Sequence, residues 1–74
     1  MYQLEEMTTF GRQLSYRTSN LLNARRMAAA VLNNDPTVSR VFIMKAAGEL
    51  AEEWHRYKGR AERVGSRPVQ TGLF

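Results

Sequence analysis

The chain has 74 residues, a net charge of +4, no Cys and one His, which excludes a disulfide framework and a zinc-stabilised fold. A core of this size supplies only about 3–5 kcal/mol, so helix packing, self-association or a partner must add stability. No apolar run reaches the roughly 18 residues of a membrane span, and the acidic pair Glu5-Glu6 replaces the basic start of a signal peptide; we therefore expect a cytoplasmic protein with no membrane partner.

The positive charge is distributed unevenly along the chain. Residues 1–34 carry a net charge of +2, residues 35–53 carry −2, and residues 54–74 carry +4. Nine of the eleven cations are Arg, whose planar guanidinium group suits carboxylate or phosphate partners and is common at interfaces. The basic C-terminal third therefore predicts a binding surface, and an ordinary solvated surface is the alternative.

The N-terminal third predicts a short helix followed by a break. Apolar or small residues recur at helical spacing at Leu4, Met7, Gly11 and Leu14. The segment 15–20 has no apolar period and ends in the capping residues Ser19 and Asn20, so we expect a kink or a break there. The alternative is one continuous helix from about Leu4 to Leu32.

The clearest helix of the chain is expected from about Asn20 to Leu32. An apolar stripe supports it, and the run of Ala residues at 28–30 combines high helix propensity with little bulk. The segment Asn33-Asn34-Asp35-Pro36 carries strong helix-stop and helix-start signals: Asn33 can end one helix, Asp35 can cap the next, and Pro36 suits its first turn. We therefore predict a helical hairpin around Asn33-Pro36.

A third helix is expected from about Pro36 to a point between Lys58 and Val64. Apolar residues recur at steps of four and three, and a row of Arg runs one position away from them. On a helix, these two rows would form an apolar stripe beside a guanidinium stripe. The alternative is a short strand within residues 37–44, which are rich in strand-forming side chains. The two rows are Ile43, Ala47, Leu50, Trp54, Tyr57, Ala61 and Val64, and Arg56, Arg60, Arg63 and Arg67.

Together these elements predict an all-α fold. We expect a small three- to four-helix domain over residues 1–64 and a flexible C-terminal tail over residues 65–74. The tail ends in Leu73 and Phe74, which makes docking of the tail an open alternative.

No catalytic or metal-binding motif accompanies these elements. There is no Cys nucleophile, no Gly-rich phosphate loop and no zinc-finger spacing. Glu52 and His55 would share one face of a helix, but a di-iron carboxylate site needs a second such pair and two further Glu. We therefore expect no enzymatic activity, no cofactor and no metal.

The segment Thr37-Val38-Ser39-Arg40-Val41 resembles the start of the recognition helix in repressors of the lactose-repressor family. Ala28 takes the position of the helix-packing Ala of that family, whereas Leu32 and Asn33 depart from its turn. The resemblance implies a helix-turn-helix DNA-binding protein. The residues that it implies are Thr37, Ser39 and Arg40 for base edges, and Arg25 or Arg26 for phosphate.

In size, charge layout and Cys-free composition, the chain also resembles the small bacteriophage-encoded regulators of host RNA polymerase. This resemblance implies a non-enzymatic transcription regulator of the host cytoplasm, which binds a larger protein complex and alters initiation or termination. We prefer this protein-binding reading; a homodimeric structural module is a further alternative. The expected partner-binding residues are Arg56, Arg60, Arg63, Arg67, Trp54 and Tyr57, with Arg12, Arg17, Arg25 and Arg26 as a second cluster.

Overall fold

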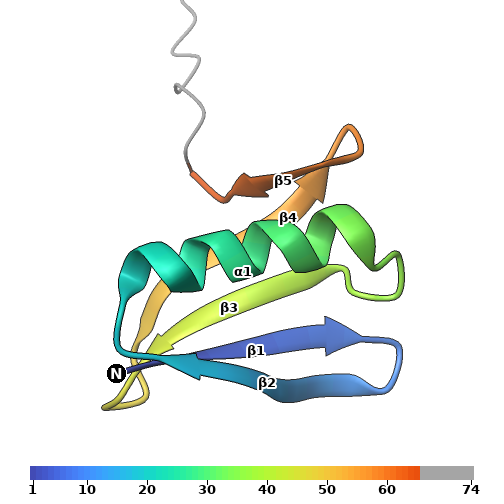
Figure 1. Cartoon of the computed structure of the whole chain (residues 1–74). Coiled ribbons are helices and arrows are strands. Elements are labelled where there is room, and N and C mark those ends of the chain that lie inside the picture. Colours follow the sequence, from blue (N-terminus) through green and yellow to red (C-terminus); the bar gives the residue numbers. More distant parts are fainter. Residues whose placement is uncertain (66–74) are drawn as a thin grey trace, which may run out of the picture.

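The computed structural model describes residues 1–65, and they form one antiparallel sheet with a single helix packed on one face (Figure 1). The sheet has five strands in the order β2-β1-β3-β4-β5. The expected tail residues 66–74 lie outside the described residues. The elements are β1 (Tyr2–Thr8), β2 (Gly11–Thr18), α1 (Leu21–Asn34), β3 (Arg40–Lys45), β4 (Leu50–Tyr57) and β5 (Arg60–Arg63).

The all-α prediction is wrong, because both segments expected to flank the central helix are strands. Residues 2–18 form the hairpin β1–β2, and residues 40–63 form the meander β3–β4–β5. The alternative of a strand within residues 37–44 is confirmed by β3. In β4 the helical apolar period is coincidental, because Trp54 and Tyr57 lie on opposite faces of the strand.

Tight turns make this sheet possible. Lys58 and Gly59 both have positive φ angles, of 50° and 80°, as a two-residue hairpin turn of the primed type requires. The turn reverses the chain between β4 and β5, in the region where the third helix was expected to end. At the other hairpin, Gly11 has a φ of 107° and follows Phe10. Thr8 supports that turn, since its hydroxyl oxygen accepts the Phe10 N–H at 3.1 Å.

The predicted helix from Asn20 to Leu32 is confirmed by α1, which extends two residues further to Asn34. The Asn20 side chain accepts hydrogen bonds from the N–H groups of Leu22 and Asn23 at 2.8 and 3.3 Å. It therefore satisfies donors that the first turn leaves unpaired.

The N-cap gives a first testable expectation. Replacing Asn20 by alanine should lower the free energy of unfolding by about 1 kcal/mol, because two amide donors lose their acceptor. Urea unfolding followed by circular dichroism measures this change. Asn20→Ser should restore most of the stability, since a serine hydroxyl can accept the same bonds; an equal loss in both variants would contradict the capping role.

The core lies between α1 and the sheet. Ala24, Ala28 and Leu32 form the buried stripe of the helix. Their small or branched side chains bring α1 close to the sheet, where Leu4, Val41, Ile43 and Val38 complete the fully buried cluster.

The predicted helical hairpin at Asn33-Pro36 is also wrong. Residues 35–39 form a loop from α1 to β3. Asp35 stabilises this loop and does not begin a second helix. Its carboxylate accepts the N–H and the hydroxyl of Thr37 at 3.0 and 2.6 Å, and these bonds lower the pKa of Asp35. Among residues 1–65, no helix is both long and apolar enough to cross a membrane.

Candidate functional site

The sheet face opposite α1 is uncovered by any other described element, and we call it the open face (Figure 1). Its residues follow from the alternation of side chains along each strand and from the register between strands. Leu4 and Ile43 point into the core, so the residues directly before and after them in the sequence point to the open face. The open face consists of Gln3, Glu5 and Met7 on β1; Arg12, Leu14 and Arg17 on β2; Arg40, Phe42 and Met44 on β3; Leu50, Glu53, His55 and Tyr57 on β4; and Arg60 and Glu62 on β5.

Phe42 occupies the centre of the open face, and Arg12 lies across it. The guanidinium carbon of Arg12 is 3.9 Å from the centroid of the Phe42 ring, within the range of a cation–π interaction. The same guanidinium donates to Glu5 at 2.6 Å and contacts the sulfur of Met44 at 3.3 Å. The central aromatic ring is therefore covered by the long side chain of Arg12 and not by a helix, strand or loop packed on it.

An ion pair and a hydrogen-bonded pair flank this apolar centre. Arg40 pairs with Glu53, and His55 lies 2.9 Å from a carboxylate oxygen of Glu62. The His55 ring also stacks on Tyr57, with 6.4 Å between the ring centroids. The Arg12 and Arg40 charges near the centre of the open face are therefore balanced by Glu5 and Glu53.

The outer strands carry cations that lack such a partner. Arg17 on β2 donates to the neutral side chain of Gln3 at 3.0 Å. For Arg60 on β5, no acidic partner is found among residues 1–65. The open face thus combines a balanced apolar centre with a positive rim on its two outer strands.

The central strand shows that this face differs from an ordinary solvated one. An antiparallel sheet with one face in water alternates apolar and polar residues, whereas a strand covered on both faces is apolar throughout. Val41 and Ile43 are fully buried under α1, while Phe42 and Met44 between them point to the open face. The apolar run at residues 41–44 is therefore the pattern of a strand with both faces covered.

The opposite side of β4 is organised by Glu52, which joins the sheet to α1. Arg25 donates to this carboxylate through both Nε, at 2.9 Å, and Nη2. The Trp54 indole N–H donates to it at 3.1 Å, and Arg63 lies 3.5 Å away. The hydrogen bonds from Arg25 and then from Trp54 lower the pKa of Glu52 against the opposing effect of its burial.

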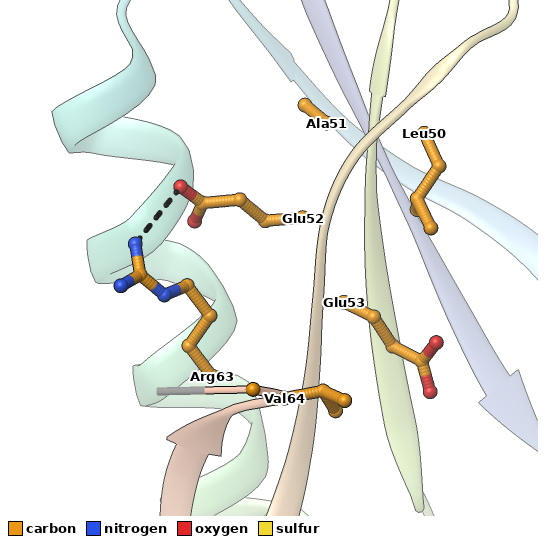
Figure 2. Close-up of a pocket in the computed structure, with 7 residues that line it drawn as sticks. Leu50, Ala51, Glu52, Glu53, Arg63 and Val64 are labelled. Atoms are coloured by element: carbon orange, nitrogen blue, oxygen red, sulfur yellow. Dashed lines mark hydrogen bonds and ion pairs between the residues drawn. The ribbon is translucent and has the colours of Figure 1, made fainter. Parts of the chain in front are cut away.

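Figure 2 shows the hollow beside this network, where Glu52 and Arg63 point towards each other near α1 and Leu50 and Glu53 point away. The hollow, of about 470 Å³, lies where β5 ends beside the first half of β4. Its charged side chains are paired with one another or with Arg25 and Arg40. We therefore interpret it as part of the structural framework.

The structure does not unite the predicted partner-binding residues on one surface. Arg56 turns inwards and donates to the carbonyl groups of Leu32, Asp35 and Val38 at 2.9–3.0 Å. Trp54 and Arg63 belong to the Glu52 network on the helix side. Only Tyr57 and Arg60 lie on the open face. Arg67 lies outside the described residues.

The helix-turn-helix alternative lacks its recognition helix. Thr37 and Ser39 lie in the loop before β3, and Arg40 begins that strand. Arg25 is committed to Glu52, while Arg26 is exposed on α1. The Thr-Val-Ser-Arg-Val resemblance therefore does not extend to the structure.

Phe42 and Met44, the apolar residues at the centre of the open face, are not among the residues expected from the sequence, whereas Arg12 belongs to the second expected Arg cluster. The uninterrupted apolar run at residues 41–44 was the available signal. It was interpreted as part of a helix because the apolar period continued beyond Met44.

Glu52 and His55 were expected on one helix face and lie on opposite faces of β4. Within residues 1–65, no cluster of three or more His, Asp or Glu side chains is arranged to hold a metal ion. Comparison with known proteins identified no matching family, no similar curated protein and no similar solved structure.

Proposed function

We propose that the chain is a non-enzymatic binding protein whose open face docks on an apolar surface of a larger protein. The observation that supports it is the central strand, in which Phe42 and Met44 present apolar side chains to the uncovered face. Aromatic residues, Met and Arg are also the side-chain types enriched in protein interfaces. Docking would exchange the Arg12 side chain over Phe42 for a packed partner surface.

Charge favours a partner with acidic groups around its apolar centre. The cations without a carboxylate partner, Arg17 and Arg60, stand on the outer strands of the open face. Carboxylates of a partner would pair with them at the rim, where such pairs speed association and set orientation. A second copy of the chain would bring a cationic rim instead, and a nucleic acid would meet Glu5, Glu53 and Glu62 across the face.

The partner that we propose to test first is bacterial RNA polymerase. This choice rests on the resemblance in size and charge layout to phage-encoded transcription regulators, with binding in the host cytoplasm. Under this proposal the chain occupies or reshapes a site on the enzyme and alters initiation or termination.

The test compares two variants that each exchange an apolar side chain for threonine. Phe42→Thr removes the aromatic centre of the open face while keeping a strand-forming residue. Leu22→Thr is the control, because Leu22 is 52% exposed on α1. Biolayer interferometry with purified bacterial RNA polymerase measures the binding. We expect Phe42→Thr to weaken binding by at least about tenfold, as loss of an interface hot spot does, and Leu22→Thr to leave binding unchanged.

Two controls define the outcome. Circular dichroism must show that Phe42→Thr is folded, and sedimentation must show that the wild-type chain is monomeric. Binding that survives Phe42→Thr, or a dimer that Phe42→Thr dissociates, would overturn docking of the open face on a larger protein. If polymerase does not bind, the same pair of variants applied to proteins captured from bacterial lysate tests the surface independently of the named partner: a captured protein that Phe42→Thr loses supports the face, and capture unaffected by Phe42→Thr overturns it.

A further inference from the structure

The two edges of the sheet differ in how they are protected. The edge strand β5 has four residues, three of them charged, and the Asn33 side chain of α1 accepts its Ala61 N–H at 2.9 Å. The other edge strand, β2, has eight residues, and every residue from Arg12 to Arg17 is exposed. Short, charged and covered edges resist strand pairing, whereas a long open edge presents a row of backbone donors and acceptors.

Among residues 1–65, no strand pairs with the outer edge of β2, and the side chains of Arg12, Ser15 and Arg17 hydrogen-bond to β1 on its inner side. Ser15 forms a bulge in this strand, since Leu4 pairs with Tyr16 while Glu5 pairs with Leu14. A shallow hollow of about 470 Å³ follows the bulge and is lined by residues 14–17. The bulge interrupts the regular edge on which strands of other molecules could pair in any register and aggregate. The rest of the edge stays available to a strand that fits around the bulge.

Apolar side chains flank this edge on both faces of the sheet. Leu14 is 50% exposed and Tyr16 is 38% exposed. They point to opposite faces, because their partners Glu5 and Leu4 are neighbours in β1. An added strand would therefore contact one apolar side chain on each face, which is how strand addition gains sequence selectivity.

The charge of the edge selects the kind of strand. From Met7 to Asn34 the chain contains four Arg and no Asp or Glu. Arg17 stands on the edge strand itself and is held only by the neutral Gln3 side chain. An incoming strand with carboxylates would supply the partner that Arg17 lacks.

We propose that the β2 edge binds an extended acidic segment of a partner protein by strand addition. A second copy of this chain fits poorly, because it would bring Arg12 and Arg17 towards the same two residues. Residues 66–74 of the chain itself contain Arg67 and no Asp or Glu, so they lack the required charge. This proposal concerns the sheet edge and does not depend on docking of the open face.

The test uses three capped synthetic peptides of the same length as β2 and the full isotopically labelled chain. In the first peptide Glu alternates with Val and Thr, and in the second Lys replaces each Glu. The third is the Glu peptide with every backbone amide N-methylated, so that neither edge of the peptide can donate to a neighbouring strand. We expect the Glu peptide to shift the amide resonances of Gly11–Thr18 and to slow their hydrogen exchange. It should bind at least about tenfold more tightly than the Lys peptide, and the N-methylated peptide should not bind.

Matched variants distinguish strand addition at the β2 edge from non-specific electrostatic attraction between the acidic peptide and the basic protein. Arg17→Gln should abolish most of the preference for Glu over Lys, whereas Arg26→Gln, an exposed cation on α1, should leave it intact. Equal binding of the N-methylated peptide, equal effects of the two variants, or shifts spread over α1 and the open face would each overturn strand addition.

The competing occupants have their own signatures. Protection of the β2 amides that increases with protein concentration in the absence of peptide would assign the edge to a second copy and overturn the proposal. Protection that disappears when residues 66–74 are deleted would assign it to the C-terminal segment with the same consequence. The Phe42→Thr variant should bind the Glu peptide like the wild type, so failure of the open-face proposal remains distinguishable.

Discussion

Replacing Arg56 by alanine is expected to lower the free energy of unfolding by about 3 kcal/mol. Its guanidinium donates to the carbonyl groups of Leu32 in the last turn of α1 and of Asp35 and Val38 in the following loop. A hydrogen bond to a charged group contributes a net of about 1.5–3 kcal/mol, and contributions from bonds made by one side chain are not additive. A cation at a helix C-terminus also complements the helix dipole. Arg56 thus fastens the helix end to β4.

Urea unfolding measures this loss, and two further variants identify its cause. Arg56→Lys keeps the charge but lacks the planar guanidinium group that donates to three carbonyl groups at once. This variant should therefore recover only part of the stability. Arg60→Ala removes an exposed Arg four residues away, and its effect should stay within about 0.5 kcal/mol. Similar stabilities of Arg56→Ala and Arg60→Ala would show that the bonds to the loop do not hold the fold together.

Arg56 also illustrates why the sequence led to the wrong surface. The row Arg56, Arg60, Arg63 has helical spacing, so a helix would place the three guanidinium groups side by side. In the hairpin β4–β5 the chain reverses between Arg56 and Arg60, and Arg60 faces the opposite side of the sheet from Arg56 and Arg63. Spacing along the chain predicts a shared face only when the type of element is known.

The helix was predictable because its signals are local. Asn20 caps its first turn, and the Ala-rich stripe continues to Leu32. Of the strands, only β3 was considered, as an alternative within residues 37–44, because the open face hides the alternation. Apolar side chains at Phe42 and Met44 interrupt the apolar–polar pattern that marks a half-buried strand.

The partner strand of β3 was not predicted, for a related reason. Its partner β4 contains four charged or polar side chains in a row of five positions, a composition that does not indicate a strand beside a core. These charged side chains are tolerated because each one meets a partner in the folded sheet. Such long-range pairing is absent from any local window of the sequence.

Removal of the Glu52 charge is expected to change both the stability and its dependence on pH. Glu52→Ala should cost about 2–3 kcal/mol at neutral pH, less than a fully buried ion pair, because the Arg25 and Arg63 side chains are 39% and 44% exposed and can rehydrate. The Trp54 indole N–H would also lose its acceptor. Glu52→Gln keeps an acceptor for Trp54, so its cost should be smaller.

The pH dependence follows from the lowered pKa of Glu52. Because the folded-state pKa lies below that of the unfolded chain, the unfolded state takes up the proton first as the pH falls. The stabilisation by Glu52 is therefore complete at neutral pH, above the unfolded-state pKa, and is lost as the pH falls through the folded-state pKa. Wild-type stability should decline along this acid limb, and the limb of Glu52→Gln should be flatter.

Urea unfolding at a series of acidic pH values measures the two curves. The difference in free energy of unfolding between the wild type and Glu52→Gln should be largest near neutral pH. It should shrink at acidic pH, where Glu52 of the wild type is protonated and uncharged like the glutamine. Asp35 titrates in both proteins, since Thr37 lowers its pKa in each, so its contribution cancels in the difference. Glu49→Gln, in the exposed turn between β3 and β4, is the matched control and should follow the wild-type curve. A difference that stays constant with pH would mean that Glu52 stabilises the helix–sheet contact through packing alone, and the ion pair with Arg25 would contribute nothing to it.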